Sequence, residues 1–263
     1  MMKTIVITGS SRGIGRGLAE AFLKRGCRVC ISSRSAASVG PATELLQGTF
    51  GSTSVTGVVA DVTQYADLLA LREHALSTFG RIDIWINNAG LSHPARPLWQ
   101  LDAATLEAVA DTNLKGTLLG SRVALEYLVA QGHGQLYNLL GLGSNGMKVP
   151  GFALYGSTKY ALKYLTDGLI REVKSTPVRV GSISPGMVVT DLLTGDYDKT
   201  SAAWAKTRKI VNILADKVET VSPWLVDQIL NDHTNGSHIA WLTKGKIVSR
   251  FALAPFRTRH MLE

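Results

Sequence analysis

The chain has 263 residues, of which 45% are hydrophobic and 26 are glycine, and its formal net charge is +8. Alternating strand and helix patterns run from residue 3 to about residue 242, which predicts one domain over residues 1–242. No stretch of about 18 apolar residues occurs, which excludes a membrane-spanning helix, and no signal peptide precedes the first strand. We therefore expect a soluble, cytoplasmic protein.

The first predicted strand, residues 3–8, is a β-branched run typical of a buried parallel strand. A turn with three glycines follows it, and a helical pattern begins after the turn. Glycine lets the backbone approach a pyrophosphate, and the first turn of a helix offers unpaired N–H groups to phosphates. The segment predicts a dinucleotide site, whose members are Gly9, Ser11, Arg12, Gly13, Ile14 and Gly15.

The second predicted strand, residues 28–33, is followed by a cation rather than by an acid. It ends at Ser33, and Arg34 comes next. NAD-selective enzymes usually present a carboxylate at this point. Arg12 reaches the same region from the glycine turn, and two guanidiniums can hold a 2′-phosphate by charge-assisted hydrogen bonds. Either arginine alone could equally be a solvated charge on the surface. Two arginines with no competing acid predict that the cofactor is NADPH.

Two cysteines, Cys27 and Cys30, form a Cys-x-x-Cys pattern. They fall at a helix-to-strand turn and inside the second predicted strand, whereas the thioredoxin-like redox motif precedes a helix. We predict that both are reduced residues that serve packing.

The segment Tyr155-Gly-Ser-Thr-Lys159 begins an amphipathic helical pattern. Residues four apart share one face of a helix, so both side chains should reach one pocket. A nearby ammonium lowers the pKa of a phenol from about 10, which suits a general acid that protonates a carbonyl oxygen as hydride reaches the carbon. The spacing alone also fits a surface pair, but the glycine turn upstream favours hydride transfer.

Further segments accompany these two, namely Asp61-Val62, Asn87-Asn-Ala-Gly90, Asn113 and Pro185-Gly186. In this order and spacing the chain resembles the short-chain dehydrogenase/reductase family over nearly its whole length. The resemblance implies a single doubly wound parallel sheet, the α/β Rossmann fold with helices on both faces, and a cofactor at the carboxyl ends of the strands. It also implies cofactor contacts by Asp61, Val62, Asn88, Ala89, Gly90, Tyr155, Lys159, Pro185, Gly186, Val188 and Thr190.

The resemblance assigns Asn113 to a proton relay through water, although Asn113 alone also suits an ordinary helix polar group and Asp61 alone a turn residue. The family places a serine about thirteen residues before the tyrosine, where position 142 here is leucine. Either Ser144 takes that role through a shorter loop, or the tyrosine works alone, or the protein is a catalytically silent NADPH sensor. The first alternative gives a metal-free catalytic set, Tyr155, Lys159, Ser144 and Asn113.

Four segments point to one branch of the family. They are the loop Gly141-Leu-Gly-Ser-Asn-Gly146 and residues 184–193, 212–216 and 219–221. These segments are similar to the chlorophyll(ide) b reductases, a branch of the family. The branch implies NADPH-dependent reduction of the 7-formyl group of chlorophyll b or chlorophyllide b to 7-hydroxymethyl. Reduction of another bulky ketone or aldehyde is the alternative among enzymes.

A predicted substrate loop over residues 187–222 is rich in apolar residues. A wide apolar lid suits a large hydrophobic macrocycle, but the same residues equally suit core or an oligomer interface. His93 lies near the expected pocket mouth, where it would either touch a porphyrin magnesium or, as the favoured interpretation, lie on a surface loop.

The C-terminal extension, residues 243–263, is basic and aromatic. No acid occurs from His233 to Leu262, and five cations do. This mixture suits peripheral attachment to an anionic, photosynthetic membrane, and equally suits packing on the domain or on a neighbouring subunit. We expect a homodimer or homotetramer, and no nucleic-acid partner, since no reading module is recognised.

Overall fold

The computed structural model describes residues 2–195, 200, 202–257 and 259–262. Its centre is one parallel sheet with the strand order β3-β2-β1-β4-β5-β6-β7. The strands are β1 Thr4–Ile7, β2 Arg28–Ser33, β3 Val55–Val59, β4 Ile84–Asn87, β5 Gly134–Leu139, β6 Val178–Ser184 and β7 His238–Ala240. The chain winds outward to β3 and then returns to place β4 beside β1, where a doubly wound sheet binds its ligand.

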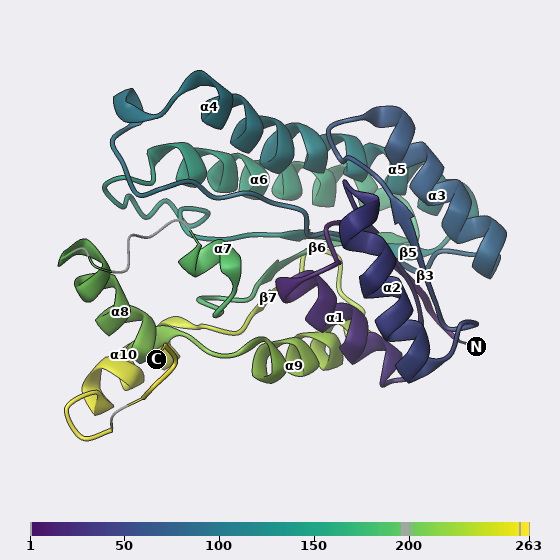
Figure 1. Ribbon diagram of the computed structural model, residues 1–263. Helices are drawn as coiled ribbons and strands as arrows, with labels where there is room; N and C mark the ends of the chain where they lie inside the picture. The colour runs from purple at the N-terminus through teal and green to yellow at the C-terminus, as the bar shows by residue number, and fades with distance from the viewer. Residues whose placement is uncertain (1, 196–199, 201, 258, 263) are drawn as a thin grey trace.

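Helices cover both faces of this sheet (Figure 1), so the predicted fold class is confirmed. One face carries α1 Gly13–Leu23, α2 Ala36–Phe50 and α9 Val218–Leu230. The other carries α3 Tyr65–Phe79, α5 Gly116–Gln131 and α6 Ala153–Glu172, with α4 Ala103–Ala110 against α6. Outside these layers lie α7 Asp191–Thr194, α8 Ala202–Leu214 and α10 Lys244–Leu253.

The two layers explain why the strands are apolar on both sides. In β1, Ile5 and Ile7 pack with Phe22 of α1 in one buried cluster. Val6, between them, packs with Leu71 of α3 in the other cluster. Side chains alternate across a strand, so a parallel strand covered on both faces buries every residue.

The cysteines divide between the same two clusters, Cys27 in one and Cys30 in the other. Both are free and buried, and burial raises the pKa of the Cys30 thiol to about 12. A thiol held in its neutral form is a poor nucleophile, so the predicted packing role is confirmed. Among the described residues, no helix is both long and apolar enough to span a bilayer.

The C-terminal extension contacts the domain at Asp216, a buried residue just beyond α8. The Asp216 carboxylate accepts hydrogen bonds from Trp241 Nε1 at 2.5 Å and from Arg250 Nη2 at 2.6 Å. Arg259 Nη2 donates to the other carboxylate oxygen at 2.7 Å. Burial works to raise the pKa of Asp216, but the hydrogen bonds from Trp241 and Arg250 and the two positive charges outweigh it and hold the pKa below its usual value.

The same two arginines bind main-chain carbonyls at the C-terminal end of α8. Arg250 donates to the main-chain oxygen of Leu214, and Arg259 donates to those of Ile213 and Ala215. The last carbonyls of a helix have no partner within it and carry the negative end of its dipole, so guanidiniums stabilise them. The extension therefore fixes the end of α8.

We predict that Asp216→Ala lowers the free energy of unfolding by about 3 kcal/mol, because it leaves two partly buried guanidiniums without their carboxylate. Urea unfolding at pH 7 measures the effect. The matched control is Asp227→Ala, which breaks the ion pair with Arg25 at a carboxylate that is 53% exposed. That loss should stay below about 1 kcal/mol, and equal losses in the two variants would contradict the prediction.

Candidate active site

The glycine turn lies between β1 and α1, directly against the end of β4. Gly9 and Gly13 have φ values of +61° and +58°, a region that favours glycine. A Cβ at Gly9 would lie 2.8 Å from Ala89 Cα, and one at Gly15 would lie 2.4 Å from Asn88 Nδ2. The turn can therefore approach β4 only because these positions lack side chains.

Hydrogen bonds join the ends of β1 and β4. Thr8 Oγ1 accepts from the main-chain N–H groups of Asn88 at 3.0 Å and Ala89 at 3.1 Å. In return, Asn88 Nδ2 donates at 2.8 Å to the carbonyls of Thr8 and Gly9. Asn88 thus holds the glycine turn in place, and Thr8 is a member of the site that the sequence analysis missed.

The start of α1 fits the phosphates of a dinucleotide. Arg12, in an extended conformation, precedes the helix without a side-chain cap, so no side chain occupies the first-turn N–H groups. Those groups and the positive end of the helix dipole attract a pyrophosphate. Ser11, Gly13 and Ile14 belong to this turn, as predicted from the sequence.

The residues predicted to lie near the adenosine half of the cofactor follow β2 and β3. Ser33 is the last residue of β2 and is half-buried, and the next residue, Arg34, is exposed. Asp61 follows β3, where its Oδ1 accepts from the main-chain and hydroxyl groups of Thr63, both at 2.9 Å. Asp61 thus forms the turn that was the alternative to a cofactor contact in the sequence analysis. Val62 is buried beside it and helps line a crevice at the carboxyl ends of the strands.

Arg12 has a competing acid, contrary to the expectation from sequence. Its Nη1 lies 3.3 Å from Asp191 Oδ2, and both side chains are largely exposed. Asp191 begins α7, far along the chain, so the pair connects the glycine turn with the predicted substrate loop. The binding of a 2′-phosphate by Arg12 and Arg34 stays a prediction.

Lys159 is buried and Tyr155 is half-buried, and the two side chains lie on one face of α6, since four residues along a helix return to the same face. Lys159 Nζ lies 5.6 Å from the centroid of the Tyr155 ring and donates to the carbonyl of Leu139, at the end of β5, at 3.1 Å. A Cβ at Gly90 would lie 3.7 Å from the same Nζ, which places Lys159 beside the loop after β4.

Burial dominates the electrostatics of this pair. It raises the pKa of Tyr155 to about 12 and lowers the pKa of Lys159 to about 8. This corrects the expectation that Lys159 lowers the pKa of the phenol, because desolvation penalises the phenolate more than the ammonium at this distance stabilises it. Tyr155 is thus held in its protonated form, as a proton donor requires.

Asn113 lies fully buried in a single π-helical turn, Asp111–Lys115, between α4 and α5. Its Oδ1 accepts from the main-chain N–H of Leu91 at 2.7 Å, and its Nδ2 donates to the Leu91 carbonyl at 3.0 Å. Nδ2 also donates to Thr158 Oγ1 at 3.1 Å. The side chain therefore ties the loop after β4 to α6, and the proton relay stays a prediction.

The loop that carries Ser144 lies against the first turns of α6. A Cβ at Gly143 would lie 2.6 Å from Gly156 Cα, and one at Gly141 would lie 2.7 Å from Tyr155 Oη. The structure thus brings this loop to the tyrosine, and a side chain at Gly141 would collide with the Tyr155 hydroxyl. The sequence analysis named Gly141 as part of this loop but did not predict that it lies against the hydroxyl. The catalytic role of Ser144 stays a prediction.

The loop after β6 closes the site from the other side. Gly186 follows the buried Pro185, and buried Val188 forms a parallel bridge with Asp216. A Cβ at Gly13 would lie 3.6 Å from Thr190 Cγ2, so this loop reaches the glycine turn. The residues predicted to border the nicotinamide are therefore beside those predicted to hold the phosphates.

His93 is 3% exposed, so the surface-loop interpretation was wrong. Its Nε2 accepts a hydrogen bond from the main-chain N–H of Tyr155 at 3.2 Å, and its Nδ1 donates to the carbonyl of Pro94 at 2.8 Å. Both ring nitrogens are engaged within the protein, which leaves neither for a porphyrin magnesium. Among the described residues, no group of three His, Cys, Asp or Glu is placed to hold a metal ion.

The predicted substrate loop contains both buried and exposed apolar residues. Trp204 and Val211 of α8 are buried, as core residues would be. Leu192 of α7 and Ile210 of α8 are among the exposed hydrophobic residues. The predicted range of this loop, residues 187–222, also includes positions 196–199 and 201, which lie outside the described residues.

The glycine turn at the switch point of the sheet and the tyrosine–lysine pair on α6 are typical of a dinucleotide-binding α/β oxidoreductase. Residues 3–201 match the model of the family described as short chain dehydrogenase, and the chain belongs to the short-chain dehydrogenase/reductase family.

Comparison with known proteins gives relatives within that family. Chlorophyll(ide) b reductase NOL of Arabidopsis thaliana is 38% identical over 272 residues, which cover 98% of this chain and 76% of that protein. The probable chlorophyll(ide) b reductase NYC1 of the same plant is 33% identical, over 94% of this chain and 52% of that protein. The crystal structure of a 3-ketoacyl-(acyl-carrier-protein) reductase from Brucella melitensis, complexed with NADH, has a TM-score of 0.79 at 26% identity, covering 91% of this chain and 96% of that chain.

Proposed function

We propose that this protein uses NADPH to reduce the 7-formyl group of chlorophyll b or chlorophyllide b to 7-hydroxymethyl. The observation that carries the substrate is the 38% identity to a protein named chlorophyll(ide) b reductase, over nearly all of this chain. The half-buried Tyr155 beside the buried Lys159 supports the reaction type. The likeness to a reductase complexed with NADH supports a nicotinamide cofactor.

The proposed reaction adds a hydride to the formyl carbon and a proton to its oxygen. The reduced nicotinamide supplies the hydride when bound. Tyr155 gives the proton from its hydroxyl, and the Lys159 ammonium stabilises the negative charge that develops beside it. Ser144 orients the formyl oxygen, Asn113 completes the water relay that returns a proton to Tyr155, and Lys159 also holds the ribose.

The test is anaerobic incubation of the protein with NADPH and chlorophyll b or chlorophyllide b, followed by pigment chromatography. We predict a 7-hydroxymethyl product from the wild-type protein. The turnover number of Tyr155→Phe should be lower by about 100-fold or more, because the variant lacks the acidic proton. NADPH binding, measured by fluorescence, should be unchanged in that variant. Tyr164→Phe is the matched control, since Tyr164 lies on the same helix but is 81% exposed.

Each contrary outcome removes a different part of the proposal. Turnover of simpler aldehydes with no hydroxymethyl product from either pigment would favour another bulky carbonyl substrate. NADPH binding without turnover of any carbonyl would favour a silent sensor. Equal turnover in wild type and Tyr155→Phe would remove the tyrosine from the mechanism.

The preference for NADPH rests on the cation after β2. Arg34 is exposed beside the half-buried Ser33, and no acid follows this strand in the sequence. A guanidinium there can bind a 2′-phosphate through two hydrogen bonds, whereas the ribose hydroxyl of NADH offers it no charge. Arg12 contributes less, because Asp191 competes for it.

We predict that Arg34→Ala lowers kcat/KM for NADPH about tenfold or more and changes that for NADH less than about threefold, since a hydrogen bond to a charged group contributes roughly 1.5–3 kcal/mol. Steady-state kinetics with both coenzymes measures this. Arg257→Ala removes an exposed cation of the C-terminal extension and serves as the control for net charge. A proportional loss for both coenzymes in Arg34→Ala would contradict a role in selecting the phosphate.

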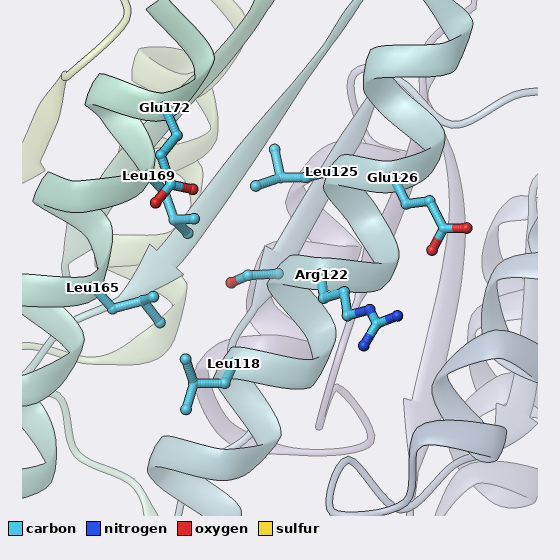
Figure 2. A pocket seen from close by; sticks show the side chains of 8 residues that line it. Leu118, Arg122, Leu125, Glu126, Leu165, Leu169 and Glu172 are labelled. Atoms are coloured by element: carbon cyan, nitrogen blue, oxygen red, sulfur yellow. The ribbon is translucent and has the colours of Figure 1, made fainter.

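The proposed homodimer or homotetramer has a candidate surface on α5 and α6. Figure 2 shows Leu118 and Leu125 of α5 and Leu165 and Leu169 of α6 pointing into a groove between the two helices. The groove is also lined by Ser121, Arg122, Glu126 and Glu172, and leucines rimmed by charged residues are typical of a protein contact. It lies on different residues from the candidate active site, so assembly there leaves the site open.

Peripheral contact with an anionic membrane is a further part of the proposal. Val248 and Phe256 are 69% and 89% exposed, and Phe251 of α10 is also exposed. Lys244 and Arg257 are exposed cations of the same extension, while two other cations bind the carboxylate after α8. Exposed aromatic residues beside cations suit an anionic headgroup region. The cytoplasmic location stays a prediction.

A further inference from the structure

We propose that His93 is a positioning residue for catalysis, which fixes the main chain of Tyr155 at the start of α6. The inference rests on the proposed role of Tyr155 as proton donor. It concerns a residue from the loop after β4, 62 positions earlier in the chain.

The start of α6 lacks a cap from its own sequence. The helix begins at Ala153, and Phe152 precedes it with no side-chain hydrogen bond to the first turn. The first N–H groups of a helix have no acceptor within it, and a buried one without a partner destabilises the fold. His93 Nε2 supplies that acceptor to the N–H of Tyr155 at 3.2 Å.

The second ring nitrogen sets the tautomer. Nδ1 lies 2.8 Å from the carbonyl of Pro94, which only accepts, so Nδ1 carries the proton and Nε2 is left with the lone pair. The ring also lies 5.7 Å from that of Phe152, centroid to centroid, and is nearly fully buried. The imidazole is therefore fixed in position as well as in tautomer.

The main-chain carbonyl of Tyr155 is held as well as its N–H. It accepts from Thr158 Oγ1 at 2.8 Å, and Thr158 Oγ1 in turn accepts from Asn113 at 3.1 Å. Asn113 makes two hydrogen bonds to Leu91, two residues before His93. The hydrogen bonds thus form a closed circuit from the loop after β4, through the π-helical turn, to both sides of Tyr155.

This circuit matters because proton transfer depends on the place of the phenol. A misplacement of about 1 Å can lower a rate about 100-fold, even when it arises away from the reacting atoms. The hydroxyl of Tyr155 lies at the far end of a long side chain, so a small rotation of the first turn of α6 moves it appreciably. Loss of the His93 acceptor frees that turn, while the glycine cradle for the cofactor is unaffected.

The test compares two substitutions at one position. His93→Phe keeps an aromatic ring against Phe152 but removes the acceptor, whereas His93→Gln keeps an acceptor oxygen. We expect kcat to fall about 30-fold or more in His93→Phe and to recover to within about fivefold of wild type in His93→Gln. KM and the NADPH dissociation constant should change less than about threefold in both, because neither substitution touches the cradle.

His74→Phe is the matched control. His74 Nε2 also makes one hydrogen bond, to Thr56 Oγ1 at 2.7 Å, but it lies on α3, away from Tyr155. Its kcat should equal that of the wild type. Equal kcat in wild type and His93→Phe would overturn the proposal. It would also be overturned if both His93 variants lost the same amount of kcat and showed the same fall in unfolding temperature, because the loss would then reflect stability alone.

Amide hydrogen exchange makes the test independent of turnover. The amide of Tyr155 should exchange about fivefold faster in His93→Phe than in wild type, since one hydrogen bond contributes about 1 kcal/mol, and His93→Gln should restore most of the protection. Unchanged exchange would overturn the proposal even if no carbonyl substrate is found. Faster exchange with no turnover by the wild type would instead count against the proposed function and leave the cap in place.

Discussion

The structure depends on one constraint, the desolvation of an ionisable pair, the buried Lys159 and the half-buried Tyr155, at the carboxyl ends of β4 and β5. Lys159 makes its hydrogen bond to the last carbonyl of β5, and its position along α6 brings Tyr155 into the same pocket. Desolvation keeps the phenol protonated and makes the ammonium easy to neutralise. The proposed proton donor is thereby kept in its protonated form, close to the loop after β4 that the glycine turn contacts.

The elements around this pair are joined by contacts between distant parts of the chain. Asn88 fastens the glycine turn to β4, and Asn113 fastens the loop after β4 to α6. On the other side of the site, the main chain of Asp216 forms hydrogen bonds with the loop that follows β6. Its carboxylate forms ion pairs with two arginines of the C-terminal extension. The extension is thus connected to the predicted nicotinamide border through a single residue.

Features with a local signal were predictable. The strand, glycine turn and helix at residues 4–23 have short-range patterns, and the doubly wound parallel sheet was expected from the family resemblance. Contacts across the fold have no such signal. The pairing of Arg12 with Asp191, the capping of α6 by His93 and the burial that sets the pKa of Tyr155 depend on which distant segments meet. A histidine beside a proline in a loop gives no indication of burial until the fold places α6 over it.

The pH dependence of carbonyl reduction tests the central claim most directly. With a pKa of about 12, Tyr155 stays protonated across the range in which the protein is assayed, and with a pKa of about 8, Lys159 loses its charge in the middle of that range. The neutral amine no longer stabilises negative charge at the phenol and at the carbonyl oxygen. The rate of reduction at saturating NADPH should therefore be level below about pH 7 and fall as the pH rises through about 8. A rate that increases from pH 7 to pH 9 would contradict this account, because it would require a deprotonated group where a proton donor is proposed.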